Sequence, residues 1–362
     1  MSENNTSFLQ LFSRKGLPFV VFRLPNTQKL IFIAQKNSTL KEIKISKIDS
    51  VIGFLIAGFE QANAGSTYFI RPDILLSDGV LSSKLQNELE ALPDIPEMPV
   101  SAGHFQTKSA YLKSVQKLID KLKSGELQKV VLSRVTHSET GMIDKGKLFT
   151  KLEQKYPEAF VYLMHLPRMG TWVGATPETL LKLNKGFGKI AALAGTTSAD
   201  AILWTDKEKE EQQMVTDYIE ETLVKEGISD FQKFGPFTLK AGNVAHLKTT
   251  FQIPFIQLKG KVGGLITRLH PTPAVCGLPK NKAFDLIQQL EEHDRELYTG
   301  FLGPWNLKGK SQLFVNLRCA RLEKSAVRIF VGGGITASSN AAAEWEETEN
   351  KAQTLLSVLK KL

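Results

Sequence analysis

The chain has 362 residues, of which 42% are hydrophobic and 23% charged, and its formal net charge is +9. This composition is typical of a globular protein with a sizeable core, and the length allows one or two domains. The basic residues are scattered among acidic ones, with no block of five like charges and no RNA-binding signature, so we expect no nucleic-acid partner. We interpret the positive charge as an attraction for a small anion.

The cysteine content and the apolar runs bear on the cellular compartment. Cys276 and Cys319 are the only cysteines and form no CxxC motif, which favours a reducing compartment and argues against a disulfide framework. The polar N-terminus has no apolar core typical of a signal peptide. The longest near-apolar run, Val51–Phe59, is shorter than the roughly 18 residues of a membrane span. We therefore expect a cytoplasmic protein with no membrane contact.

Residues 1 to about 105 have the pattern of strands and turns. The runs Phe19–Pro25 and Lys29–Gln35 flank a short turn and predict a hairpin, and Ser66–Ile70 predicts a further strand. Three prolines between Leu92 and Pro99 indicate a loop. No residue of this part indicates chemistry, so we expect it to support the remainder of the chain.

A clear helix begins near Thr107, because apolar residues recur at helical spacing from Tyr111 to Leu122. The strand predicted over Leu127–His137 then brings Lys129 to the same face as two valines. A half-buried lysine is a candidate base, because desolvation lowers the pKa of lysine. The alternative is a lysine at a strand end whose ammonium group extends into water.

Glu178 precedes the apolar strand Thr179–Leu183, and a carboxylate in such surroundings can have a raised pKa and act as a general acid. Further on, Gly195 and Thr196 end a predicted strand where a ligand could approach the backbone. The helix predicted from Asp206 to Glu226 is so charged that Glu211 reads as solvent-exposed.

Two residues of the next segments sit on predicted strands. A single histidine on a strand, such as His246, is more often a hydrogen-bonded core residue than a catalyst. Arg318 interrupts an apolar strand predicted from Ser311 to Glu323, and a bound carboxylate would match its guanidinium.

Near the C-terminus, three glycines from Gly332 to Gly334 separate an apolar run from a helix that Ser338, Ser339 or Asn340 can cap. Glu347 and Lys351 share one face of that helix. A carboxylate and an ammonium beside an anion-binding turn suit a metal ion that binds a carboxylate substrate. The alternative is a surface ion pair next to a tight connection.

Ten motifs occur in a fixed order between about Thr107 and Leu362: KVVLSR, GATPETLL, LAGT, EEQQMV, HLKTTF, HPTPAVCGLPK, RELYTGFLG, VNLRCARL, GGGI and EWEETENK. Together they resemble the chorismate-utilising enzymes, which include isochorismate, salicylate, anthranilate and aminodeoxychorismate synthases. The resemblance implies an α+β fold of α/β/β/α layers, with two large sheets packed face to face and helices outside. Residues 1–105 would be the N-terminal strand-rich part and residues 106–362 the chorismate-binding catalytic region of one compact domain.

The resemblance also implies roles for single residues. Lys129 matches the general base and Glu178 the general acid. Glu211 and Glu347 match the carboxylates that bind Mg²⁺, with Glu210 or Glu208 as alternatives for the first. The matching substrate contacts are Gly195, Thr196, His246, Ala274, Arg318, Gly332 and Lys351.

Three positions discriminate within the family. Anthranilate synthases carry glutamine in place of Lys129, aminodeoxychorismate synthases carry a nucleophilic lysine in place of Ala194, and the enzymes that eliminate pyruvate carry threonine in place of Ala274. The resemblance therefore implies a monomeric isomerase, an isochorismate synthase that acts on chorismate with Mg²⁺ and without a glutamine amidotransferase subunit. Its product would serve menaquinone or catecholate siderophore synthesis. A salicylate synthase and a non-catalytic polyanion-binding module are the alternatives.

Overall fold

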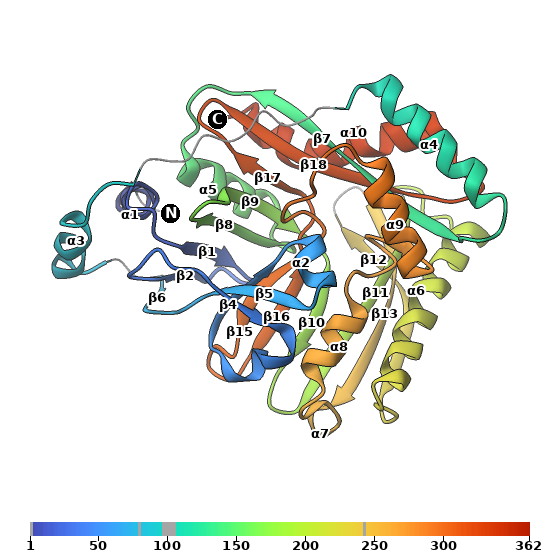
Figure 1. Ribbon diagram of the computed structural model, residues 1–362, viewed down its shortest axis with the longest axis horizontal. Helices are drawn as coiled ribbons and strands as arrows, with labels where there is room; N and C mark the ends of the chain where they lie inside the picture. The colour runs from blue at the N-terminus through green and yellow to red at the C-terminus, as the bar shows by residue number, and fades with distance from the viewer. Residues whose placement is uncertain (1–2, 79–80, 96–105, 242–243) are drawn as a thin grey trace.

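The computed structural model describes residues 3–78, 81–95, 106–241 and 244–362, so the loop predicted at Leu92–Pro99 lies partly outside the described residues. In the described part, two nine-stranded sheets lie face to face, and helices cover both outer faces (Figure 1). Neighbouring strands are antiparallel in both sheets. The layered α/β/β/α architecture predicted for an α+β fold is confirmed.

The first sheet has the spatial order β14-β7-β18-β17-β9-β8-β1-β2-β6. Its strands are β1 (Phe19–Arg23), β2 (Leu30–Ala34), β6 (Ile74–Ser77), β7 (Lys129–Glu139), β8 (Phe160–Leu166), β9 (Gly170–Thr176), β14 (Gly277–Leu278), β17 (Cys319–Leu322) and β18 (Ala326–Ile335). Its outer face packs against α1 (Glu3–Arg14), α5 (Lys145–Lys155) and α10 (Ala341–Leu359), which contribute Phe12, Phe149 and Leu355 to one apolar cluster.

The second sheet has the spatial order β12-β13-β11-β10-β16-β15-β4-β5-β3. Its strands are β3 (Lys41–Lys44), β4 (Gly53–Ala57), β5 (Ser66–Ile70), β10 (Thr179–Leu183), β11 (Phe187–Ser198), β12 (Gln232–Ala241), β13 (Val244–Pro254), β15 (Phe301–Trp305) and β16 (Ser311–Val315). The helices α6 (Asp206–Lys225), α7 (Phe255–Leu258) and α8 (Val262–Leu269) and the 3₁₀ helix η1 (Ile45–Ser50) pack on its outer face.

The remaining helices are α2 (Phe59–Asn63), α3 (Ser83–Glu90), α4 (Lys108–Leu122) and α9 (Lys280–Leu290). The helix predicted after Thr107 is α4, and the Thr107 hydroxyl caps it by accepting a hydrogen bond from the Ala110 N–H at 3.2 Å. Its apolar stripe packs with α9 and the start of β7 in a separate cluster.

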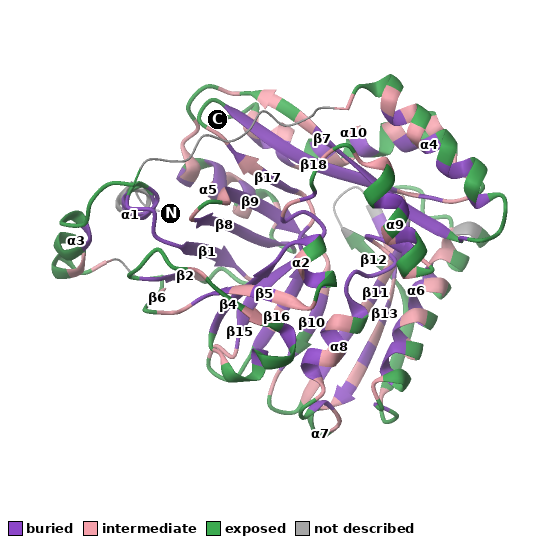
Figure 2. Ribbon diagram, viewed as in Figure 1, coloured by how far each residue is buried: buried purple, intermediate pink, exposed green. Residues whose placement is uncertain are grey.

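Aromatic side chains fill the space between the sheets. Phe160 of the first sheet stacks on Phe314 of the second, with ring centroids 4.1 Å apart and planes 9° apart. Phe22 and Phe54 pack beside this pair, and the strands there are buried on both faces (Figure 2). Removing so much apolar surface from water stabilises the contact between the sheets.

The first 105 residues contribute strands to both sheets. They supply β1, β2 and β6 to the first sheet and β3, β4 and β5 to the second. The predicted hairpin is the antiparallel pair β1–β2, and the predicted strand Ser66–Ile70 is β5. Because this segment completes both sheets, we propose that it forms one structural domain with residues 106–362.

Two local predictions are wrong. The apolar stretch around Arg318 is two strands, β16 and β17, which belong to different sheets, and Arg318 has a positive φ of 49° at the connection between them. Both flanks are apolar because both sheets bury that region. Gly332 to Gly334 lie inside β18 and not in a turn before the helix. The helix α10 begins after Asn340, whose side chain caps it as predicted.

Candidate active site

Lys129 is the first residue of β7 and is buried, with 3% of its surface exposed. Its Nζ atom lies 2.5 Å from Oε1 of Glu211. The neighbouring strand provides space for the side chain, because a Cβ atom at Gly334 would lie only 2.6 Å from Cε of Lys129. The prediction of a half-buried lysine is confirmed, and the alternative of a lysine extending into water is wrong.

Glu211 lies on α6 and does not have the solvent-exposed position that its charged helix predicted. Its side chain is 31% exposed and points to Lys129. The next residue, Gln212, is buried and orients the helix: its Oε1 accepts a hydrogen bond from the Ala194 N–H at 2.9 Å. By contrast, Glu208 caps the start of α6 at Thr205, and Glu210 is exposed.

Glu178 lies in the short link between β9 and β10, where the chain crosses from the first sheet to the second. Its backbone carbonyl accepts a hydrogen bond from the Val315 N–H at 3.0 Å. Burial raises the pKa of its carboxyl group to about 7, while the positive charges of Lys129 and Lys351 act in the opposite direction. The carboxyl group is therefore within electrostatic reach of both lysines.

Arg318 lies in a second crossing, from β16 to β17, directly beside the first one. Its carbonyl accepts a hydrogen bond from the Ala175 N–H at 3.1 Å. Its guanidinium donates to the Thr354 hydroxyl at 3.2 Å and more weakly to the Lys351 carbonyl at 3.4 Å, both on α10. Burial lowers the pKa of this guanidinium, and the negative charge of Glu347 opposes that effect.

Glu347 and Lys351 form an ion pair of 2.6 Å on α10, and Nζ of Lys351 also donates to the Gly332 carbonyl at 2.8 Å. Burial opposes ionisation of Glu347, but the charge of Lys351 and its hydrogen bond outweigh burial and lower the pKa of Glu347. The Glu211 carboxylate raises this pKa and Lys129 lowers it. The two acids and two lysines therefore form one cluster of charges.

His246 and Gly195 border this cluster from neighbouring strands of the second sheet. On β13, His246 pairs with Thr196 of β11, next to a bulge at Gly195, where φ is +62°. Burial lowers the pKa of His246, a hydrogen bond with the Gly195 backbone opposes this effect, and the charge of Arg318 adds to it. The structure thus brings these residues to the same site as the lysines and acids.

Ala274 lies in the turn between α8 and β14. The carbonyl of the next residue, Val275, accepts a hydrogen bond at 2.9 Å from Arg295. This turn is therefore attached to the segment that follows α9, which the sequence did not assign to the site.

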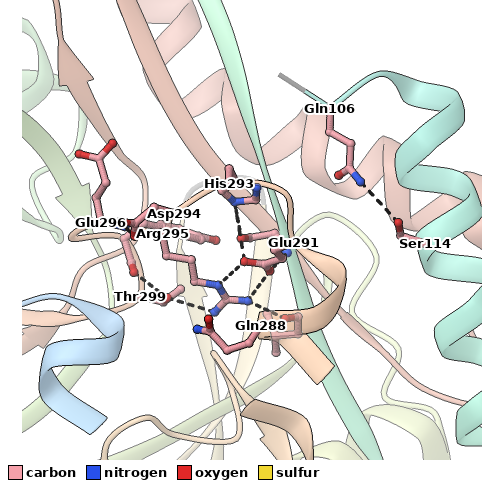
Figure 3. Close-up of polar contacts among 12 residues, drawn as sticks. Gln106, Ser114, Gln288, Glu291, His293, Asp294, Arg295, Glu296 and Thr299 are labelled. Carbon is pink, nitrogen blue, oxygen red and sulfur yellow. Dashed lines mark hydrogen bonds and ion pairs between the residues drawn. The ribbon is translucent and has the colours of Figure 1, made fainter. Parts of the chain in front are cut away.

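In that segment, Arg295 donates two hydrogen bonds to Glu291, of 2.8 Å and 2.6 Å, and points toward Thr299 (Figure 3). Both charged side chains are more than nine-tenths buried. Arg295 also donates to the Val131 carbonyl at 2.8 Å, and Glu291 accepts from the Ser133 N–H at 2.6 Å. The buried pair therefore fixes the strand that carries Lys129.

Tyr298 is a further residue that the sequence did not single out. Its hydroxyl lies 3.1 Å from the position of a Cβ atom at Gly332, so a side chain at Gly332 would meet it. Burial raises the pKa of Tyr298, and the charges of Arg295 and Arg318 act in the opposite direction. Its motif RELYTGFLG was the available signal, but spacing alone does not show that the tyrosine faces Gly332.

The described residues contain no group of three or more histidine, cysteine or acidic side chains arranged to bind a metal. Among the carboxylates of the cluster, Glu211 and Glu347 are the pair close enough to affect each other's ionisation. As for membrane contact, none of the helices in the described ranges is long and apolar enough to cross a bilayer.

Known proteins are similar to this chain in sequence and in structure. Residues 78–360 match the family described as chorismate binding enzyme. Isochorismate synthase EntC of Escherichia coli strain K12 is 31% identical over 251 residues, which cover 64% of this chain and 62% of that protein, so the match spans less than two thirds of the relative's length. The vibriobactin-specific isochorismate synthase of Vibrio cholerae is 28% identical over 334 residues, covering 89% and 82% of the two chains.

The structure of MenF, the menaquinone-specific isochorismate synthase of E. coli, superimposes with a TM-score of 0.77 at 20% identity and covers 96% of this chain and 90% of its own. At that identity the superposition shows a shared fold. Together with the family match over most of the chain, it leads to one conclusion: this protein belongs to the chorismate-binding enzymes.

Proposed function

We propose that this protein is an isochorismate synthase, an isomerase that interconverts chorismate and isochorismate. The observation that carries the proposal is that the buried Lys129 lies within electrostatic reach of Glu178, a carboxyl group whose pKa is about 7. Such a carboxyl group can supply a proton near neutral pH, which an ordinary glutamate cannot. The similarity to isochorismate synthases supports the same reaction.

In the proposed mechanism, Lys129 accepts a proton from a water molecule that attacks C2 of the chorismate ring. The ring double bonds shift, the C4 hydroxyl leaves, and Glu178 donates the proton that converts it to water. One water enters and one leaves, so the reaction is an isomerisation. The Nζ atom of Lys129 is in contact with Glu211 at 2.5 Å and must turn towards the water to accept its proton. The proton transfer therefore requires Lys129 to leave Glu211.

Two anionic groups of the substrate would bind to the surrounding residues. We assign the enolpyruvyl carboxylate to Arg318, whose hydrogen bonds to Lys351 and Thr354 are long and can be exchanged for a bidentate contact. The Gly195–Thr196 backbone would lie beside the same group. Binding the ring at two places fixes its orientation, which lowers the entropic cost of the reaction.

Glu211 and Glu347 fit a Mg²⁺ ion, because Mg²⁺ prefers oxygen ligands and is often bound by one or two carboxylates and water. Their side chains are 31% and 51% exposed, so water can complete the coordination. When bound, the ion would attract and orient the ring carboxylate of the substrate. Lys351 and the Gly332 backbone would border that position.

The test is incubation of the purified protein with chorismate and Mg²⁺, followed by chromatography of the products. We expect isochorismate and no salicylate, because Ala274 lacks the hydroxyl associated with pyruvate elimination. Salicylate fluorescence would instead identify a salicylate synthase. Unchanged chorismate would contradict the proposal, and salt-dependent binding of DNA in that case would support a polyanion-binding module.

We further propose that the enzyme acts as a cytoplasmic monomer without a glutamine amidotransferase subunit. No such subunit is needed because a base-activated water, and not ammonia, is the proposed nucleophile. The product would serve menaquinone or catecholate siderophore synthesis.

A further inference from the structure

Each of the two carboxylates assigned to the metal is bound by a lysine. Glu211 contacts Nζ of Lys129 at 2.5 Å, and Glu347 contacts Nζ of Lys351 at 2.6 Å. The two pairs also affect each other electrostatically, since Glu211 and Lys129 both influence the ionisation of Glu347. The positions that a cation would take beside these carboxylates therefore carry ammonium groups.

The positive charges around the two carboxylates oppose the binding of a further cation. Arg318 acts on Glu347 in addition to the two lysines, so three cationic side chains surround two carboxylates. A divalent cation that approached would meet neutralised ligands and like charges. Its binding would require the ammonium groups to move away from the carboxylate oxygens.

We propose that Lys129 and Lys351 compete with the divalent cation for Glu211 and Glu347, so that cation binding and release of the two lysines are one exchange. The proposal rests on the proposed function in that it takes these two glutamates as the metal ligands. Its consequence is that a bound cation withdraws Glu211 from Lys129 and breaks the 2.5 Å contact that holds this lysine. The anionic substrate favours the same exchange because it supplies new partners for the lysines.

The opposite arrangement makes the opposite prediction. If the lysines oriented the carboxylates for the metal, removing an ammonium group would weaken cation binding. If the lysines compete, removing an ammonium group strengthens it. The sign of the change therefore tests the proposal.

The experiment uses Mn²⁺ as the probe, and measures the free ion by electron paramagnetic resonance with the full chain and no substrate. We expect Lys351→Met to lower the dissociation constant for Mn²⁺ at least tenfold, and Lys129→Met to do the same. Lys108→Met is the matched control, because the exposed Lys108 of α4 pairs at 3.6 Å with Glu346, the neighbour of Glu347 on α10. It should leave the dissociation constant unchanged.

Circular dichroism shows which variants are folded. Lys351→Met is the variant expected to disturb folding less, because the Lys351 side chain is 29% exposed. Unchanged or weaker Mn²⁺ binding in a folded Lys351→Met or Lys129→Met protein would overturn the exchange, as would undetectable binding in all proteins. Chorismate turnover by the wild-type enzyme with Mg²⁺ is measured separately. Turnover with no gain in Mn²⁺ affinity overturns the exchange alone, whereas absent turnover overturns the proposed function.

Discussion

Lys129 and Glu211 are 82 residues apart in the chain, and their Nζ and Oε1 atoms lie 2.5 Å apart in the structure. This contact joins the start of β7, in the first sheet, to α6 on the outer face of the second sheet. It connects the candidate base to a candidate metal ligand, so changes at either residue should affect both functions.

Replacing the proposed base or acid should reduce turnover strongly. We expect Lys129→Gln and Glu178→Gln each to lower kcat by at least ~10²-fold, the usual contribution of a general acid or base. The measurement is the rate of isochorismate formation by folded protein. Lys282→Gln, at an exposed lysine on α9, is the control and should retain the wild-type rate. Near-wild-type rates in both active-site variants would show that the roles are wrongly assigned.

The pH dependence should report the raised pKa of Glu178. A general acid must be protonated, and a carboxyl group with a pKa of about 7 loses its proton as the pH rises through that value. We therefore expect kcat/KM to decrease above about pH 7, tenfold per pH unit. Glu178→Gln should remove this decrease from the residual activity. A decrease that persists in the variant would assign the titration to another group.

The buried pair Glu291–Arg295 should contribute strongly to stability. Glu291→Gln leaves the Arg295 guanidinium without its counter-ion among buried groups, which costs about 3–5 kcal/mol of unfolding free energy. Denaturation in urea measures the change. Glu221→Gln is the matched control, because Glu221 and Lys225 have the same spacing but are exposed, and such pairs contribute about 1 kcal/mol or less. Equal effects of the two substitutions would contradict the role of burial.

Ala274→Thr should introduce pyruvate release. The added hydroxyl lies in the turn whose next residue is attached to Arg295, so its position is well determined. We expect isochorismate formation to continue and pyruvate to appear, detected by coupling to lactate dehydrogenase. Pyruvate at the wild-type background level would remove Ala274 from the residues that decide the product.

The sequence predicted local structure correctly where an element buries one face, because the spacing of apolar residues then shows the type of element. The stripe from Tyr111 to Leu122 predicted α4, and the hairpin β1–β2 followed from two apolar runs around a turn. The motifs in the sequence also indicated Lys129 and Glu178 as the candidate base and acid. How these two residues approach each other was not contained in the pattern.

The tertiary structure decided what spacing leaves open. Glu291–Arg295 and Glu347–Lys351 have the same spacing in the sequence, yet the first pair is almost wholly buried and Glu347 is half-exposed. Burial depends on which elements pack over a residue, and spacing along the chain does not contain that information. Arg318 shows the same limit, because continuous apolar sequence cannot reveal that the chain leaves one sheet and enters the other.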